Sequence, residues 1–472
     1  MLARLDPAEY VLPVFVGIGA VMVGLLAGES PKFAVAASLA VAFMLLAVVS
    51  LSAGVVAFTL ITYLELAPAI GGPALSFSKV AGGVLALSFI AAYAWKDDKD
   101  DVVWAKFPFL ASVIGALIVW HVASYFWAEQ PGETSPSIIR IILNSALLII
   151  VFEAVRDTRT VRAVLGAMVA GATVAAVYGI IATPSAAEFA YSSTAGSGLG
   201  RLAGTVGDPN ELASLLVVGL VLSGVLAATS KGAMRAIWIG AAVLCGGAMF
   251  LTGSRGGLVA LAAVLVVAII VTPRRRALVI SVVVITAVSA TMYYTTIASQ
   301  EAQDRITLSD GGTGRTDIWR IGWRMFEDKP IQGVGANNFQ VASIHYLLAE
   351  PGAILNDIYV VDQPAVAHNT YLHVLAELGV VGFSLFMLTL GILIGYLIRA
   401  IGIFKRLKDR QMELLVTGLV LSLVGLLAAD VFLSEQYSKQ LWILLALAPA
   451  LYAMAQRDEA RARVSGAATG TS

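Results

Sequence analysis

The stretch VVGFSLFMLTLGILIGYLIRAIGIF, residues 380–404, contains Arg399 as its one charged residue. A helix needs roughly 20 mainly apolar residues to cross a bilayer, and this stretch meets that requirement. The chain as a whole has the same character, because 58% of its 472 residues are hydrophobic and only 13% are charged. A soluble domain has about a quarter of its residues charged. The sequence therefore predicts an integral membrane protein.

Similar apolar runs occupy most of the chain. They predict an all-α polytopic membrane protein with about 14 transmembrane helices. The second and third runs join without a charged break, so the range is about 12–14 helices. The first run is interpreted as an uncleaved span, because further spans follow it directly. The predicted spans lie near residues 10–27, 33–50, 51–65, 78–95, 107–127, 137–155, 161–183, 209–229, 236–252, 256–273, 277–296, 380–404, 412–430 and 437–455.

Basic residues gather between alternate predicted spans. With fourteen spans and the N-terminus inside, every basic cluster falls on the side where the positive-inside rule places the cytoplasm. We therefore expect both termini in the cytoplasm. The clusters are Lys96 to Lys106, VRDTRTVR (155–162), Lys231 with Arg235, RRR (274–276), KRLKDR (405–410) and RDEARAR (457–463).

A long segment, residues 297–379, is predicted to lie outside the membrane on the opposite face. It is rich in aromatic residues, and TDIWRIGWRMFEDKP (316–330) has the pattern of an amphipathic helix that ends at a proline. We predict that residues 1–296 form transmembrane helices 1–11 and that residues 297–379 form a folded extracytoplasmic subdomain. Residues 380–455 would then form helices 12–14, and residues 456–472 a cytoplasmic tail.

Charge and cysteine content argue against several classes of function. The formal net charge is zero, so the composition does not indicate a nucleic-acid partner. Cys245 is the one cysteine, which excludes an intramolecular disulfide and a cysteine-based zinc site. No nucleotide-binding glycine motif is present. We predict no metal and no cofactor.

Two arginines at predicted outer ends of spans are candidates for a binding site, because charges at a membrane rim are costly. Arg255 lies in LTGSRGG (251–257), between two spans with almost no loop. Arg315 lies in DGGTGRTDIWR (310–320), where a glycine-rich lead-in and a helix start offer backbone N–H groups to an anion. The structural alternatives are an Arg255 that reaches lipid headgroups and a solvated loop residue at Arg315.

A third arginine precedes a predicted helix start in GLGRLAGTVGDPNELASLL, residues 198–216. Asp208 is a good N-cap there and Pro209 fits the first turn. Capping does not explain Asn210 at the top of an apolar span, nor Arg201 just before it. Both are therefore candidate site residues.

His368, one of four histidines, lies in AHNTYLHV (367–374) at the start of a predicted helix. A neutral imidazole is a good proton acceptor near pH 7. The structural alternative is a histidine that only forms a hydrogen bond at the helix start. Asn369 and Tyr371 are possible supporting residues. His373 is expected to lie on another face of the helix and to be dispensable.

Arginines and a histidine on one membrane face indicate a particular chemistry. Guanidinium groups match the geometry and charge of a diphosphate. A histidine can take the proton of an attacking hydroxyl, and a diphosphate leaves well when arginines stabilise its charge. The pattern predicts glycosyl transfer from a lipid diphosphate sugar to a hydroxyl on the outer face.

Four motifs together resemble the O-antigen ligase and Wzy-type polysaccharide polymerase family. They are GTVGDPNELA (204–213), LTGSRGG (251–257), GRTDIWRIGWRMFEDKPIQGVGANNF (314–339) and AHNTYLHVLAELGVVGF (367–383). The resemblance implies a GT-C-type glycosyltransferase of the bacterial inner membrane, with its active site on the periplasmic side. It implies a donor glycan on undecaprenyl diphosphate.

The resemblance also implies roles for individual residues. Arg255 and Arg315 match the essential arginines of the family, and His368 matches its proposed catalytic histidine. Arg201 and Asn210 match less closely. The implied transfer inverts the anomeric centre and needs no metal.

The resemblance leaves the acceptor open. A ligase transfers the glycan to a lipid A core sugar, whereas a polymerase adds it to another lipid-linked repeat unit. Fourteen spans slightly favour a polymerase. An alternative from another class is a flippase for lipid-linked oligosaccharides. A flippase needs polar residues along a path through the membrane, whereas the span centres here are apolar.

Overall fold

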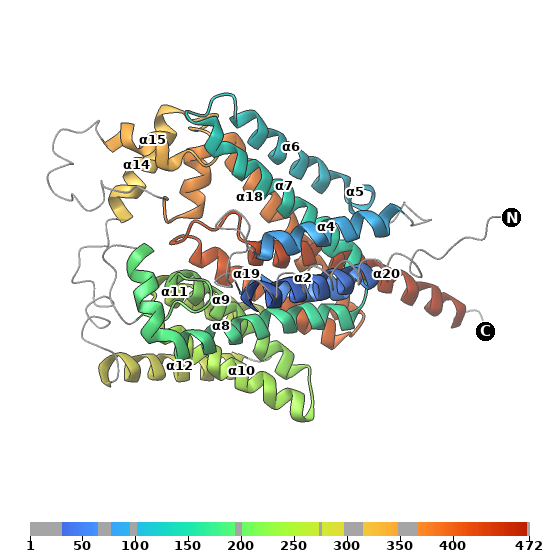
Figure 1. Ribbon diagram of the computed structural model, residues 1–472. Coiled ribbons are helices and arrows are strands. Elements are labelled where there is room, and N and C mark those ends of the chain that lie inside the picture. Colours follow the sequence, from blue (N-terminus) through green and yellow to red (C-terminus); the bar gives the residue numbers. More distant parts are fainter. Residues whose placement is uncertain are drawn as a thin grey trace.

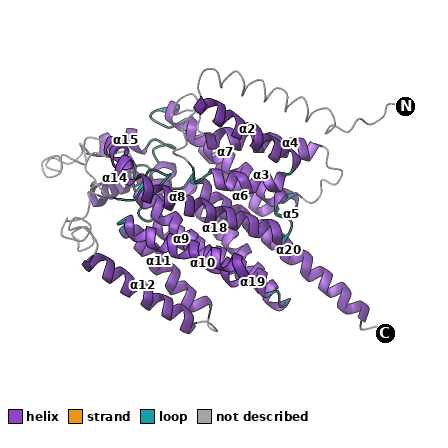
Figure 2. Ribbon diagram, turned by 60° about the horizontal axis from the view of Figure 1, so that its bottom comes forward, coloured by secondary structure: helices purple, strands orange, loops and turns teal. Residues whose placement is uncertain are grey.

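The computed structural model describes residues 31–64, 77–94, 102–193, 201–272, 276–296, 315–347 and 366–469. Every regular element in these ranges is a helix, and they contain no strand (Figure 2). The prediction of an all-α protein is therefore confirmed. The first predicted span, 10–27, lies outside the described residues.

Each of the other predicted spans overlaps a helix. The helices before the long segment are α2 (Pro31–Val49), α3 (Leu51–Ile61), α4 (Phe77–Ala94), α5 (Val103–Lys106), α6 (Pro108–Ser124), α7 (Pro131–Ala154), α8 (Thr158–Ser193), α9 (Pro209–Ala228), α10 (Gly232–Leu251), α11 (Arg255–Val271) and α12 (Arg276–Thr296). The remaining helices are α14 (Arg315–Asp328), α15 (Phe339–Leu347), α18 (Thr370–Arg406), α19 (Arg410–Ala429) and α20 (Lys439–Thr469).

Seven helices in the described ranges are long and apolar enough to cross a membrane, which supports a multi-pass membrane protein. They lie in α7, α8, α9, α10, α12, α18 and α19, and five further apolar helices are shorter. The count of fourteen spans stays a prediction. The helix α20 continues without interruption past residue 455, where the predicted last span ends.

The helix α20 runs through the middle of the bundle, where it packs against α7, α18 and α19 (Figure 1). Its side chains from Leu441 to Ala448 are almost completely buried, which is expected of a helix that is apolar all round. A second group of helices, α8, α10, α11 and α19, surrounds α9. The helices α14 and α15 lie at one end of this bundle, and the C-terminus of α20 lies at the other end (Figure 1).

The amphipathic helix predicted at 316–330 is present as α14 and packs on α15 and α18. Its buried residues Ile321 and Met325 belong to a small core that is separate from the main one. Val334, Phe339 and Ala376 contribute to the same small core. These contacts join the two helices of the long segment to the start of α18.

The segment between α14 and α15 docks where α18 is interrupted. Gly379 has a non-helical backbone with φ of 64° and ψ of −169°. The N–H of Val380 donates to the carbonyl of Pro330 (2.8 Å), and the N–H of Val334 donates to Ala376 (3.0 Å). Backbone hydrogen bonds therefore replace helical ones at the interruption, and they set the position of α14 relative to α18.

A buried carboxylate adds to this docking. Glu377 accepts hydrogen bonds from the backbone N–H groups of Asn337 (2.9 Å) and Phe339 (3.0 Å). Its Oε1 also lies 3.0 Å from His373 Nε2, and the other ring nitrogen of His373 lies 3.0 Å from Ser434 Oγ. These contacts give His373 a structural role that the sequence pattern does not indicate.

We expect Gly379→Ala to destabilise the protein by about 3 kcal/mol, because alanine is strained at positive φ and overpacking adds to the cost. A β-carbon at Gly379 would overlap the carbonyl oxygen of Ile331. The matched control is Gly391→Ala, in the same helix, where a β-carbon meets open space. The midpoint of detergent-induced unfolding measures both variants. Equal midpoints for the two would contradict the assigned role of the interruption.

Candidate active site

A hydrogen-bond network around Asn210 joins the start of α9 to the turn between α10 and α11. Arg201 Nη2 and Ser254 Oγ both donate to Asn210 Oδ1, at 3.0 and 2.9 Å. Arg201 Nε donates to the carbonyl of Thr252 at 2.8 Å. The structure therefore brings Arg201 and Asn210 together beside the turn that carries Arg255.

Arg255 is the first residue of α11, which Ser254 caps by accepting the N–H of Gly257 at 3.1 Å. The side chain is half-buried, and its Nη2 is fully buried without a hydrogen-bond partner among the described residues. A buried donor of a charged group that lacks a partner is costly. An anionic ligand at the start of α11 would remove this cost.

Arg315 is the first residue of α14, and its Cζ lies 6.0 Å from the centre of the Phe432 ring. This distance is within the range of a cation–π contact. Phe432 also lies near Trp319, with ring centroids 6.3 Å apart, and a β-carbon at Gly256 would lie 3.4 Å from it. Phe432 therefore connects the starts of α11 and α14.

The charges of the two arginines act on each other. Burial lowers the pKa of Arg315, Asp208 acts in the opposite direction, and the charge of Arg255 lowers this pKa further. The two guanidinium groups therefore influence each other electrostatically. Such a pair is well suited to an anion with more than one negative charge.

His368 directly precedes the cap of α18 and has a positive φ of 47°. Burial lowers the pKa of its imidazole, and the nearby charge of Arg315 lowers it further. Asp208 raises this pKa and His373 lowers it, both less strongly. The imidazole is therefore neutral at pH 7 and can accept a proton.

Asp208 has a second role that the sequence did not indicate. Its Oδ1 accepts the N–H groups of Asn210 (2.6 Å) and Glu211 (2.9 Å), so the predicted cap of α9 is present. Its charge also acts on Arg315 and on His368. Because local capping explains an aspartate at this position completely, the sequence gives no sign of its electrostatic effect on Arg315 and His368.

Asn369 and Tyr371, the two possible supporting residues, hold the start of α18 in place. Asn369 caps the helix by accepting the N–H of Leu372 at 3.0 Å. Tyr371 donates its hydroxyl to the carbonyl of Leu427 at 2.7 Å. These two contacts fix the backbone on both sides of Thr370. Because His368 directly precedes Asn369, they also restrict the position of His368.

Asp430 is a second acidic residue that sequence reasoning missed. Its side chain is buried, with 2% of the residue exposed. Its Oδ2 is buried without a hydrogen-bond partner among the described residues, and its backbone carbonyl accepts the N–H of Thr370 at 2.8 Å. The end of α19 at Asp430 therefore holds the first residue of α18 in place.

The site thus combines cationic groups from several segments with one neutral imidazole. The part of the chain that the structure describes contains no group of three His, Cys, Asp or Glu side chains that could hold a metal ion. Arg255 and Arg315 can bind an anion, and His368 can take a proton. Arg201 lies in the adjoining network around Asn210.

Residues 240–387 match a family model that is described as O-antigen ligase. This range includes Arg255, Arg315 and His368. A search of curated proteins finds no match. The family match supports a glycosyl-transferring membrane enzyme of the ligase or polymerase type, and it confirms the resemblance that the motifs indicated. Residues 240–387 of the chain are thus similar to the O-antigen ligase family.

Proposed function

We propose that the protein transfers a glycan from undecaprenyl diphosphate to a sugar hydroxyl of an acceptor, with inversion at the anomeric carbon. The acceptor is a second lipid-linked repeat unit in a polymerase or a lipid A core sugar in a ligase. One observation carries the proposal. Phe432 contacts the starts of both arginine-bearing helices: its ring centre lies 6.0 Å from Arg315 Cζ, and it lies beside Gly256, the residue after Arg255. The charge of Arg315 also acts on the imidazole of His368.

Each group has a role in the proposed reaction. Arg255 and Arg315 bind the diphosphate, and Arg201 supports them from the network around Asn210. The acceptor hydroxyl attacks the anomeric carbon, His368 takes the hydroxyl proton, and the bond from this carbon to the diphosphate oxygen breaks. The diphosphate leaves with the electron pair of that bond, and the arginines stabilise its charge. Asn369 and Tyr371 fix the position of His368.

The proposed topology follows from the positive-inside rule. Residues 297–379 would lie on the periplasmic side of the inner membrane with the active site, and both termini would be cytoplasmic. Residues 1–296 and 380–455 would form the fourteen-helix, GT-C-like membrane domain. Residues 456–472 would form the cytoplasmic tail.

The decisive experiment supplies purified full-length protein with an undecaprenyl-diphosphate glycan and candidate acceptors. A ladder of lengthened lipid-linked glycan identifies a polymerase, and transfer to a core saccharide identifies a ligase. A parallel reaction in EDTA is expected to proceed equally well, and its failure would contradict the metal-independent mechanism.

The same protein in vesicles tests the transporter alternative. Movement of the glycan lipid across the bilayer without any product would support a flippase and would contradict glycosyl transfer. We expect product formation without coupled movement of the intact donor.

We expect the pH dependence of the transfer rate to follow the protonation of the His368 imidazole. Because burial and Arg315 lower its pKa below the ordinary value of about 6.5, the rate should be constant from neutral pH upward. It should fall on the acid side as the imidazole becomes protonated.

The variant Asp208→Asn keeps a good helix cap but removes the charge that raises the pKa of His368. We therefore expect the acid limb of the rate profile to move to lower pH in this variant. An acid limb that stays in place would contradict the assignment of the limb to His368.

A further inference from the structure

Two aromatic side chains, Trp319 and Phe432, lie among the helix starts that form the candidate active site. Trp319 follows Arg315 by one turn of α14, so these two side chains lie on the same face of the helix. Phe432 lies in the segment between α19 and α20, and its ring centroid is 6.3 Å from that of Trp319. The planes of the two rings meet at 34°, so the rings are tilted and do not stack flat on each other.

The segment that carries Phe432 is fixed to the start of α18. Thr370, the first residue of this helix, donates its Oγ1 hydrogen to the carbonyl of Leu433 at 2.9 Å. Phe432 also lies beside Gly256 and within cation–π range of Arg315. The aromatic pair is therefore adjacent to the starts of α11, α14 and α18, the three helices whose starts carry the candidate arginines and follow the candidate base.

Hydrophobic core packing does not explain the aromatic pair. Neither ring belongs to the main core or to the small core of α14 and α15, although Ile318, the neighbour of Trp319, packs on the small one. Both side chains are half-buried, so part of each ring stays accessible. The indole Nε1 of Trp319 is buried and has no hydrogen-bond partner among the described residues. A buried indole N–H usually has a partner, so this group is suited to a ligand oxygen.

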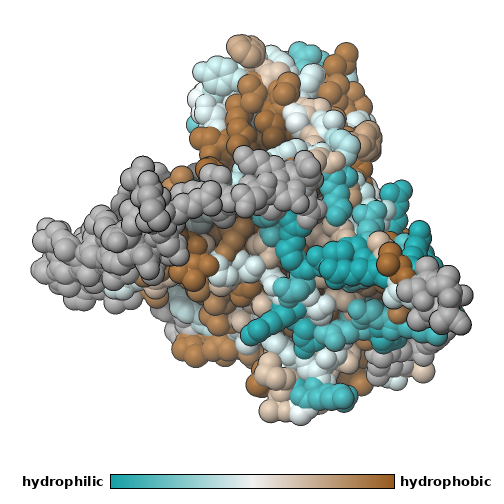
Figure 3. Space-filling view, turned by 90° about the vertical axis from the view of Figure 1, so that its right-hand side faces the viewer, coloured by the Kyte–Doolittle hydropathy of each residue, from teal (hydrophilic) through white to brown (hydrophobic). Residues whose placement is uncertain are grey.

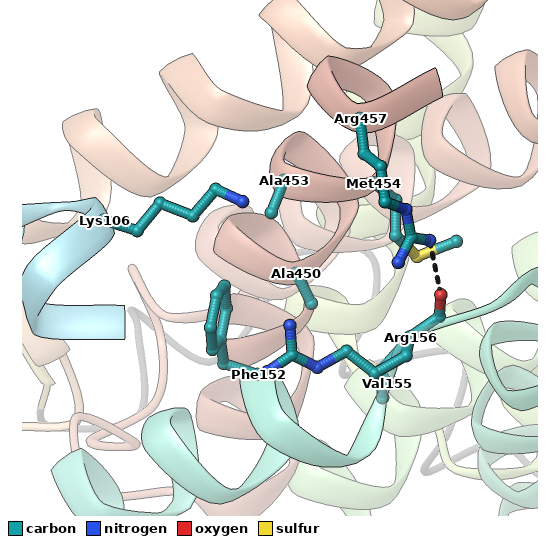
Figure 4. Close-up of a pocket in the computed structure, with 8 residues that line it drawn as sticks. All are labelled: Lys106, Phe152, Val155, Arg156, Ala450, Ala453, Met454 and Arg457. Atoms are coloured by element: carbon teal, nitrogen blue, oxygen red, sulfur yellow. Dashed lines mark hydrogen bonds between the residues drawn. The ribbon is translucent and has the colours of Figure 1, made fainter. Parts of the chain in front are cut away.

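A buried polar atom without a partner also occurs at the end of the molecule opposite α14 and α15, where hydrophilic side chains gather (Figure 3). That atom is Arg457 Nε, and the rest of its guanidinium has local contacts. Its Nη2 donates to the carbonyl of Arg156 at 2.7 Å (Figure 4, dashed line), and Asp458 Oδ1 lies 4.0 Å from Nε. These contacts hold α20 against the end of α7, so Arg457 has a structural role. The one polar atom of the Trp319 indole has no such contact in the part of the chain that the structure describes.

We propose that Trp319 and Phe432 bind the sugar ring that is attached directly to the diphosphate of the donor. This inference rests on the proposed function and names the contact for the reacting sugar. The anomeric carbon must lie between the arginines that hold the diphosphate and the histidine that takes the proton, and the aromatic pair lies at the starts of the same helices. The apolar C–H face of the sugar packs on the aromatic rings, and a sugar oxygen accepts the N–H of Trp319.

The test compares the binding of two lipids to the purified full-length protein in detergent, measured by microscale thermophoresis. One is undecaprenyl diphosphate with a single N-acetylglucosamine, and the other is undecaprenyl diphosphate without a sugar. We expect the parent to bind the sugar-bearing lipid more tightly. Trp319→Ala should weaken the binding of this lipid about tenfold and leave the binding of the sugar-free lipid unchanged, because only the contact with the sugar is lost.

Two further variants separate the ring of Trp319 from its N–H and from general effects on α14. Trp319→Phe keeps an aromatic ring and loses the donor, so its loss of affinity for the sugar-bearing lipid should be smaller, about threefold. The matched control is Trp323→Ala, one turn further along α14. Trp323 is 50% exposed, and its Nε1 already donates to Glu327 Oε1 at 2.8 Å. This control should bind both lipids as the parent does.

Arg315→Gln serves as the opposite reference. Because both lipids carry the diphosphate, this variant should weaken the binding of both. A selective effect of Trp319→Ala beside a general effect of Arg315→Gln would therefore place the sugar at Trp319 and the diphosphate at Arg315.

Three results would overturn the proposal. An equal loss of affinity for both lipids in Trp319→Ala would mean that Trp319 supports the diphosphate site, and the proposed function would stand without the sugar contact. Unchanged affinity for both lipids would exclude Trp319 from binding the donor. If the parent bound neither lipid, the donor in the proposed function would be wrong and this inference would fall with it. Thermal unfolding shows whether each variant is folded, and if Trp319→Ala does not fold, the same comparison is decided by Trp319→Phe.

Discussion

Replacing His368 with alanine is expected to reduce glycan transfer by about 10² to 10⁴, the usual contribution of a general base. The neutral imidazole beside Arg315 would take the proton of the acceptor hydroxyl. Without it the hydroxyl must lose its proton to water. The loss should fall on kcat, because His368 is not expected to contribute to binding of the diphosphate. Initial rates at saturating donor measure this effect.

A second variant is needed because the backbone conformation at His368 is unfavourable for alanine. Its φ of 47° lies in the left-handed region, which asparagine tolerates better than alanine does. His368→Asn therefore keeps the backbone preference while it removes the base, and it should be as inactive as His368→Ala. If either variant matched the parent rate while folding normally, His368 would not be the base.

The control for both variants is a histidine outside the site. His373 does not serve, because it is buried between Ser434 and Glu377 and its loss would disturb the docking on α18. His345 is exposed on α15 and lies 2.7 Å from Glu129 Oε1. His345→Ala should therefore retain the parent rate.

The helices were predictable because the signals for them are local. Each apolar run contains enough residues to identify a membrane helix, and the cap at Asp208 is visible within a few residues. The interruption of α18 at Gly379 was not predictable from its own neighbourhood. It depends on backbone hydrogen bonds to Pro330 and on Glu377, which the chain brings together only when it folds.

The candidate site residues could be proposed from the sequence, whereas the contacts between them could not. Charge at a membrane rim and the resemblance to a family indicated Arg255, Arg315 and His368. Phe432 joins the two arginine-bearing helix starts, and neither its type nor its neighbours indicate this contact.

The second large effect concerns the two arginines at the helix starts. We expect Arg255→Gln and Arg315→Gln each to lower kcat/KM by about 10² to 10³. This is the usual effect of removing one hydrogen-bond donor that stabilises the negative charge developing in the transition state. Arg320→Gln is the matched control, because Arg320 lies on α14 but is exposed and pairs with Asp317 at 3.3 Å. It should behave as the parent does.

The double variant separates a shared site from two independent ones. If Arg255 and Arg315 bind the same diphosphate, the losses should combine to less than the product of the single effects, because residues that act as a unit are not additive. Strict multiplication would indicate that each arginine contacts a different anion. Arg255→Lys should not restore activity, since an ammonium cannot replace the guanidinium whose Nη2 is buried without a partner among the described residues. If Arg255→Lys regained the parent activity, the positive charge at this position would be enough to bind the diphosphate of the glycan donor. The geometry of the guanidinium at the start of α11 would then not be required.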